Sequence, residues 1–406
     1  MNIRPMISAL RRHKTASLLI VLEIALSCAI ICNALFMVVE RLDRLNQPGG
    51  VAQDQLLQIQ LAGTGDQDNA AAMTREDLAT LRAISGVEGA TLTNQVPFSG
   101  SAWDTSLALS PDQEHHTLMA AMYLGSEGFL DVMGLNLIAG RDFAADEYQD
   151  FAAVMSATDT SKLHSPILIS REAADRLFPD GTALGKTVYT ANIPLTIVGI
   201  IDVLARPYQS EGNWSYSIVL PLRTTYAEGS YALRVADPGR RNDILAAATS
   251  ALERIDPNRI VLNQRTYEDI RTEHFSSDRA MVWLLVVVCA ALLVVTALGV
   301  VGLASFWVTQ RTRQIGVRRA LGATRGQILR YFQAENFLLT SAGIALGMLL
   351  AYALNQVLMT RYELPRLPLA YLPAGAVVLW LLGQAAVLWP ARRAASVPPA
   401  IATRGA

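Results

Sequence analysis

Charge and cysteine are both scarce in this sequence. Only 17% of its 406 residues are charged, whereas 51% are hydrophobic, a balance too apolar for an ordinary soluble enzyme. Its three cysteines, Cys28, Cys32 and Cys289, all lie in long apolar stretches. The long segment between those stretches therefore folds without disulfides. We interpret the three thiols as small packing residues.

Recognisable catalytic and metal-binding motifs are also missing. The sequence has no Gly-x-Ser-x-Gly, His-Glu-x-x-His or paired-cysteine pattern. Segment 180–187, DGTALGKT, approaches a phosphate-binding loop, but Asp180 stands where that loop needs its first glycine, so we interpret it as a turn entering a strand. His115 and His116 have no further ligand at a helpful spacing, which favours a solvated loop. We expect no catalytic residue, cofactor, metal site or nucleic-acid partner.

Four apolar stretches reach or approach the roughly 20 residues that a helix needs to cross a bilayer. They are Ala16 to Val39, Ala280 to Val308, Phe337 to Met359 and Tyr371 to Trp389. The first stretch is long for a signal peptide, and the charged sequence RLDR follows it instead of a small-residue cleavage site. We therefore interpret it as an uncleaved anchor.

Acidic and basic residues are segregated along the chain. Residues 41–280 hold 31 Asp and Glu against 19 Lys and Arg, a net charge of −12, and the remainder holds 4 against 15, a net charge of +11. Thirteen of these 15 basic residues precede the first stretch, join the second to the third or follow the fourth. Because positive loops mark the cytoplasmic side, we expect both termini inside and the acidic segment outside the inner (plasma) membrane.

This topology divides the whole chain. We expect a cytoplasmic N-terminus (1–15), transmembrane helix 1 (16–39), a periplasmic domain with helical stalks (40–279), transmembrane helix 2 (280–308), a basic cytoplasmic loop (309–336), transmembrane helix 3 (337–359), a short outer loop (360–370), transmembrane helix 4 (371–389) and a cytoplasmic tail (390–406).

The expected periplasmic domain has the pattern of a mixed α/β fold. Strand patterns occur at 56–61, 87–96, 118–124, 167–170, 186–190, 195–201, 218–222 and 231–235, and helix patterns at 129–133, 171–178 and 242–255. Thr74 to Asp77 has the spacing of a helix N-terminus, and segment 144–164 is typical of a loop. At the two ends, 40–45 and 267–279 favour helical stalks above the bilayer, the alternative being simple overrun of the membrane helices.

Two carboxylates fall near the cytoplasmic ends of the apolar stretches. Glu23 lies about two turns into the first, and Glu335 lies at the entrance to the third. Since a buried carboxylate is costly in lipid, we favour salt bridges to arginines of the basic loop over a proton relay.

Small residues recur every fourth position in the third stretch, at Gly343, Gly347 and Ala351. This spacing lets two helices approach closely, either within one subunit or between two.

The basic loop has a readable local pattern. Residues 310–335 are QRTRQIGVRRALGATRGQILRYFQAE. Ile315 to Leu321 predicts a short amphipathic helix, Gly322 its C-terminal stop, and Thr324 the cap of a new helix entering the third stretch. A basic helix resting on anionic lipid is one interpretation of this loop.

This loop closely resembles the cytoplasmic loop of MacB/FtsX-type ABC transporter permeases, whose pattern is Arg-x-Arg-Glu-Ile-Gly-x-Arg-x-Ala-Leu-Gly-Ala. Gln314 replaces the usual Glu. Segments 137–143, 169–178, 184–188 and 197–201 resemble the MacB-type periplasmic domain in order, and 390–399 resembles the family's C-terminal ending. The resemblance covers nearly the whole chain.

The resemblance implies mechanotransmission. A separate ABC ATPase dimer would push the loops of two permease chains, identical or paralogous, and so move the stalks and the periplasmic domains. The chain itself would be non-catalytic. The residues implied in ATPase coupling are Arg311, Arg313, Ile315, Gly316, Val317, Arg318, Arg319, Ala320, Leu321 and Gly322.

Several functions compete on this scaffold. An outer segment of about 240 residues is too large for the cell-division type and fits either efflux or lipoprotein extraction. We favour efflux of drug- or peptide-like substrates, with an adaptor and an outer-membrane channel, because Arg141 and the Leu184 to Lys186 segment look more like that branch. A signalling receptor is the alternative from another class, but only the short loop is available as its output. A secondary transporter has too few ionisable residues at mid-membrane.

Overall fold

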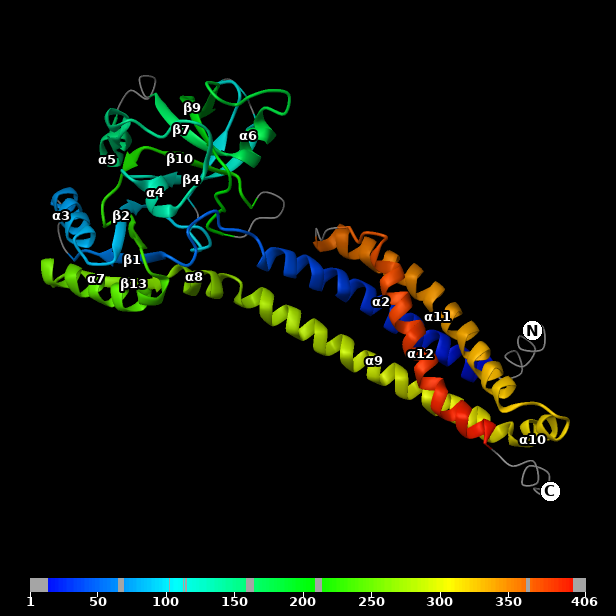
Figure 1. The fold of residues 1–406 in the computed structure, drawn as a ribbon. Coiled ribbons are helices and arrows are strands. Elements are labelled where there is room, and N and C mark those ends of the chain that lie inside the picture. Colours follow the sequence, from blue (N-terminus) through cyan, green and yellow to red (C-terminus); the bar gives the residue numbers. More distant parts are fainter. Residues whose placement is uncertain are drawn as a thin grey trace. The chain divides into compact units, whose positions relative to one another are not determined.

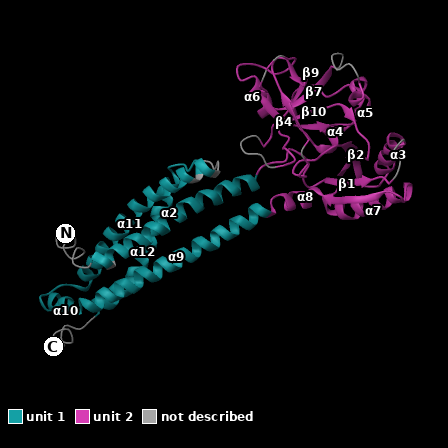
Figure 2. Cartoon of the chain, turned by 180° about the vertical axis from the view of Figure 1, so that it is seen from behind, with its two compact units in different colours: residues 1–46, 277–406 teal, residues 47–276 magenta. Residues whose placement is uncertain are grey.

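The computed structural model describes residues 14–64, 69–101, 103–111, 113, 115–157, 164–208, 214–362 and 366–396. The chain forms two compact units (Figure 2). Unit 1 comprises residues 1–46 and 277–406, and unit 2 comprises residues 47–276.

Unit 1 is built from long helices. They are α2 (Lys14–Leu45), α9 (Ser276–Gln310), α11 (Arg325–Tyr362) and α12 (Tyr371–Ala395), with the short α10 (Thr312–Ala320) between α9 and α11 (Figure 1). Each of the four long helices is long and apolar enough to cross a membrane. Helices α2, α11 and α12 lie side by side and share a buried cluster that includes Ile24, Cys28, Ile344 and Leu379.

The described residues of unit 2 form two main sheets. The smaller has the order β13-β1-β12-β2, all antiparallel. Its strands are β1 (Leu56–Ala62), β2 (Val87–Thr93), β12 (Ser230–Val235) and β13 (Ile260–Thr266). Helices α3 (Ala70–Arg82) and α7 (Arg241–Ile255) pack on one face, with Leu57, Leu81, Leu233 and Leu252 in the shared core. The turn η3 (Pro238–Arg240) leads into α7.

A buried ion pair ties α3 to the segment before β13. Arg259 Nη2 donates to Asp77 Oδ1 at 2.9 Å and to the Leu252 carbonyl at 3.1 Å. The Tyr231 hydroxyl also donates to Asp77, and burial, with this carboxylate beside it, raises the pKa of Tyr231. Because the pair is fully buried, removing one partner leaves an uncompensated charge and destabilises the fold strongly, whereas the intact pair adds little net stability.

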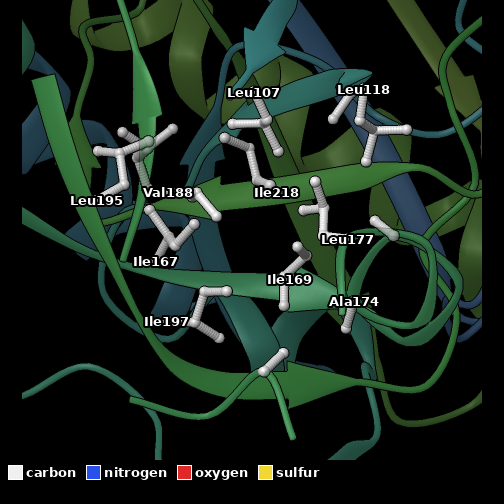
Figure 3. Close-up of a cluster of buried hydrophobic side chains, with 14 of the residues drawn as sticks. Leu107, Leu118, Ile167, Ile169, Ala174, Leu177, Val188, Leu195, Ile197 and Ile218 are labelled. Atoms are coloured by element: carbon white, nitrogen blue, oxygen red, sulfur yellow. The ribbon is translucent and has the colours of Figure 1, made fainter. Parts of the chain in front are cut away.

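The larger sheet is mixed, with the order β3-β4-β10-β7-β9-β5 and β8 paired to β9. Its strands are β3 (Asp104–Leu107), β4 (Leu118–Leu124), β5 (Leu137–Gly140), β7 (Ser165–Ser170), β8 (Thr187–Thr190), β9 (Ile193–Ile201) and β10 (Ser217–Leu220). Pairs β4/β10 and β7/β9 are parallel. Figure 3 shows how Ile167, Ile169, Ile197 and Ile218 meet in its core.

Short elements complete unit 2. They are α4 (Phe129–Met133), α5 (Phe151–Met155), α6 (Arg171–Leu177), η1 (Ala145–Glu147) and the small pair β6 (Gln149–Asp150) with β11 (Leu222–Arg223). Segment 144–164, expected to be a loop, thus contains short regular structure up to Met155, and residues 158–163 lie outside the described residues. The mixed α/β pattern expected for this part of the chain is confirmed.

The predicted helix N-terminus at Thr74 is wrong. Helix α3 already begins at Ala70, so Thr74 lies inside it. Its hydroxyl donates to the Ala70 carbonyl at 2.7 Å and accepts from the Tyr226 amide at 3.1 Å. A Ser/Thr-x-x-Asp spacing inside a helix resembles a capping box, and here tertiary contacts use both side chains instead.

Candidate functional site

The short helix α10 is bounded as the sequence predicts. Gly322 adopts φ +92° directly after it, a left-handed conformation that glycine tolerates without strain. The Gly322 and Ala323 amides donate to the carbonyls of Arg319 and Arg318 at 3.1 Å, the pattern of a glycine C-cap. Thr324 then caps α11, since the Gln327 amide donates to its hydroxyl and the Gln327 side chain accepts from its amide.

One face of α10 is anchored within the chain. Arg311 Nη1 donates to the Glu335 carboxylate at 2.8 and 3.0 Å, and its guanidinium lies 5.7 Å from the Trp307 ring. Ile315 is buried in a cluster of residues from α9, α11 and α12 that includes Val308, Phe332, Val387 and Ala394. Gly316 is also buried. The anchor fixes which way the helix faces.

The other face of α10 is open. Val317 is 46% exposed and Leu321 82% exposed, beside the exposed Ala320 and Gly322. Arg313 and Arg318 are exposed too, Arg318 lying 5.0 Å from the Tyr331 ring, and Arg319 is half-buried. An exposed leucine flanked by guanidinium groups is suited to an acidic-rimmed apolar groove or an anionic surface. Ile315 was also expected among the coupling residues. It is a buried core residue of this chain, so it does not lie on the exposed face of α10.

The two intramembrane carboxylates differ in their surroundings. The salt bridge expected for Glu335 is confirmed, with Arg311 as its partner and only 1% of its side chain exposed. Glu23 makes no ion pair in the described part of the chain. Its carboxylate lies against α9, where a Cβ built on Gly299 would be 2.3 Å from Glu23 Oε1. Close by, the hydroxyls of Ser27 and Thr296 are hydrogen-bonded at 2.7 Å, joining α2 to α9.

The small residues of α11 pack against α2 of the same chain. A Cβ on Gly343 would lie 2.8 Å from the Ile24 Cβ, and one on Gly347 would lie 2.5 Å from the Cys28 Cβ. Ala351 is fully buried, and its carbonyl accepts from Asn33 Nδ2 at 3.2 Å. The sequence left open whether these small residues pack within one subunit or between two. In the structure they pack against α2 of the same subunit.

We expect Gly347→Leu to disrupt this packing. The added side chain meets the Cys28 Cβ and the Ala25 carbonyl, 2.7 Å from its Cβ, so α2 and α11 must separate. Overpacking typically costs about 1–3 kcal/mol, occasionally more. Thermal unfolding in detergent should show a lowered midpoint. Gly302→Leu is the matched control, because nothing lies within 4 Å of a Cβ on this exposed glycine of α9. Equal midpoints for the two variants would contradict the expectation.

The predicted stalks have helical structure with one interruption. Helix α2 continues to Leu45, whereas the second stalk consists of α8 (Tyr267–His274) and then α9, which begins at Ser276 after a break at Phe275. Arg41 of α2 is paired with the buried Asp278 of α9. This pair was not predicted from the sequence, although opposite charges at the C-terminal end of one span and the N-terminal end of the next are a signal for it.

The two segments that favoured efflux lie in loops of unit 2. Arg141 donates to both Glu147 carboxylate oxygens at 2.7 and 2.6 Å, and these hydrogen bonds lower the pKa of Glu147. Gly185 has φ +74° and leads into β8, which confirms the interpretation of segment 180–187 as a turn entering a strand. Both segments adjoin strands of the larger sheet: Arg141 follows β5, and Leu184 to Lys186 precede β8.

Four long apolar helices, an α/β unit between the first two in sequence and a basic helix between the next two define a multi-pass membrane protein of the permease class. The chain belongs to the MacB/FtsX family of ABC transporter permeases. Residues 17–252 match the family model of the MacB-like periplasmic core domain, and residues 286–399 match that of the FtsX-like permease C-terminal region.

Individual proteins and a solved structure are also similar to this chain. The chain is 28% identical to the macrolide export ATP-binding/permease protein MacB of Chromobacterium violaceum over 67% of this chain and 41% of that protein. It is 24% identical to the uncharacterized ABC transporter permease YknZ of Bacillus subtilis, over 99% of this chain and 98% of that one. The solved structure of the periplasmic region of MacB from Actinobacillus actinomycetemcomitans is similar to this chain at 16% identity and a TM-score of 0.35. The match covers 57% of this chain and 97% of that structure. The chain spans less than half the length of the MacB relatives it matches.

Proposed function

We propose that this chain is the transmembrane subunit of a mechanotransmission-type ABC transporter. The observation that carries the proposal is the two-faced helix α10. One face is held by the Arg311–Glu335 pair and Ile315, and the other presents Val317, Ala320 and Leu321. A helix fixed to its own bundle and apolar on its free face can receive a push from a docked partner and pass it to α9 and α11.

The partner that fits this face is a separate ABC ATPase dimer. Each permease chain offers one such helix, whereas a closing ATPase dimer offers two equivalent surfaces, so two permease chains, identical or paralogous, complete the assembly. Anionic lipid is the competing occupant of the same face. Arg313 and Arg318 would supply charge to the rim of the contact.

The assembly is tested by co-expressing the chain with the ABC ATPase encoded nearest to its gene. Native mass spectrometry of the purified complex should give two permease chains with two ATPase chains. A monomeric permease beside an active, transport-competent ATPase would contradict the proposal.

We propose export as the direction of transport. Relatives are named macrolide export proteins, which supports efflux of drug- or peptide-like molecules from the periplasm or outer leaflet, with an adaptor and an outer-membrane channel. Lipoprotein extraction remains the alternative on the same scaffold. A transport assay with a macrolide and, separately, with an acylated lipoprotein distinguishes the two.

The proposed topology places unit 2 outside and α10 inside. A cysteine at the exposed Ser156 should react with a membrane-impermeant maleimide in intact cells. A cysteine at the exposed Gly326 should react only after permeabilisation. The unmodified chain, whose three cysteines lie within α2 and α9, gives the background. Labelling of position 326 in intact cells would reverse the orientation.

A further inference from the structure

Within unit 2, the segment that follows α2 and the helix that precedes α9 both lie against one aromatic side chain, Phe98. The ring of Phe98 lies 5.1 Å from that of Phe275, the residue at the break between α8 and α9. It lies 5.0 Å from the His274 ring, and the Arg271 guanidinium lies 5.5 Å from it. Phe275 is 2% exposed and Phe98 5% exposed, so the contact is dry.

The connection from α2 reaches the same place. A Cβ built on Gly49 would lie 2.1 Å from the Tyr267 hydroxyl oxygen and 3.5 Å from Phe98 Cε2. No other residue type fits there without displacing the tyrosine of α8. Arg271 Nη1 also donates to Gln53 Oε1 at 3.1 Å. The segment that follows the first stalk and α8, the first helix of the second stalk, are therefore packed around one phenylalanine.

The backbone of Phe98 is held in an unfavourable conformation. Its φ of +64° lies in the left-handed region, which a bulky side chain rarely adopts. Such strain persists only where surrounding contacts impose it, and it concentrates at sites that work by conformational change.

Phe98 is joined to the larger sheet by its own loop. The Phe98 amide donates to the Arg206 carbonyl at 3.3 Å, and the Gly100 amide donates to the Pro207 carbonyl at 2.8 Å. Arg206, 2% exposed, pairs with Asp104 at 3.0 Å, and Asp104 is the first residue of β3. A continuous path of contacts thus runs from Phe275 through Phe98 and Arg206 to the edge of the larger sheet.

We infer that Phe98 is the positioning residue through which a change in the stalks reaches the larger sheet. The inference rests on the proposed function, because it names the residue of unit 2 that responds to the proposed motion of the stalks. When α9 shifts at Phe275, the packed ring of Phe98 must follow. Its strained backbone then relaxes, and the loop that holds Arg206 and β3 moves with it.

The test is a double-mutant cycle read by hydrogen–deuterium exchange. The full chain is placed in nanodiscs of phosphatidylethanolamine and phosphatidylglycerol without any ATPase. Arg41→Met breaks the ion pair with Asp278 and so loosens the contact between α2 and α9. The substitution is far in sequence from the segments whose exchange is measured. We expect it to raise exchange in 104–107 and 202–208 by about twofold or more, the lower range of coupling between groups in one network.

Phe98→Gly removes the ring and suits the positive φ, so the variant can fold without backbone strain. In that background, Arg41→Met should cause no further rise in 104–107 and 202–208, with a fully deuterated sample setting the ceiling. Asn192→Gly is the matched control, because Asn192 also has positive φ, at +68°, but lies in the turn between β8 and β9. With it, the response to Arg41→Met should remain.

Two results would overturn the inference. One is an equal response to Arg41→Met with and without the Phe98 ring. The other is no response in the two segments in any background. Because no ATPase is present, either result leaves the proposed ATPase docking untouched, and failure of that docking leaves this cycle interpretable.

Discussion

Ala320→Asp is expected to abolish ATPase association and transport while membrane insertion and the fold of unit 2 persist. In the chain alone Ala320 is exposed on α10, so a carboxylate there stays solvated and the helix is undisturbed. In the docked complex the same carboxylate would be desolvated beside Val317 and Leu321 without a partner. Losses of about 2–5 kcal/mol or more are typical when a buried interfacial charge is left unpaired.

The measurement is a pull-down of the co-expressed ATPase, followed by transport in vesicles. Ala152→Asp is the matched control, since Ala152 is an exposed helical alanine of α5 in unit 2. Arg318→Ala, at an exposed rim position, should give a partial loss that grows with salt, because rim charges contribute less and are screened. If α10 only rests on anionic lipid, association survives Ala320→Asp. Undiminished association and transport would remove this helix from the mechanism.

Sequence patterns predicted those elements that local chemistry determines. Helices α4, α6 and α7 and strands β1, β4 and β9 begin and end within a few residues of the expected positions, because periodicity and flanking turns define them. The stop at Gly322 and the cap at Thr324 follow from backbone conformations that those residue types favour.

Tertiary partners could not be predicted in the same way. Ile315 and Val317 are both apolar residues of α10, yet Ile315 shares a buried cluster with Val387 and Ala394 of α12, which lie more than 70 positions later in the chain. Periodicity identifies an apolar residue without saying whether its own chain or another molecule covers it. The same limit explains Thr74, whose capping pattern is used for contacts with distant residues.

Glu23 shows that the partner of a charged side chain in a membrane helix could not be predicted from the sequence. The sequence shows a carboxylate near the N-terminal end of α2, which we expect to be the cytoplasmic end, and the expected proximity to the basic loop favoured an arginine partner. In the structure that position faces Gly299 of α9, where the missing side chain makes room for the carboxylate. Which face of a membrane helix meets which neighbour depends on packing of small residues, such as Gly343 and Gly347 against α2.

The second large effect is expected from Glu335→Ala. This change leaves the largely buried guanidinium of Arg311 without its counter-ion, since the Arg311 side chain is 12% exposed and that of Glu335 1%. Breaking a buried ion pair by removing one partner costs about 3–5 kcal/mol. We expect a clearly lowered thermal midpoint in detergent and weaker ATPase association, because α10 loses the contact that fixes its orientation.

The double variant Arg311→Met with Glu335→Leu separates anchoring from chemistry. Replacing both members of a buried pair by apolar residues of similar size is often neutral or stabilising. If the pair only anchors α10, the thermal midpoint and ATPase association both recover, because Ile315 still holds the helix and the face of Val317 and Leu321 is unchanged. If Glu335 instead carried protons, the double variant would be stable and bind the ATPase but would not transport. Recovery of transport together with stability therefore identifies the Arg311–Glu335 pair as the mechanical attachment of the helix.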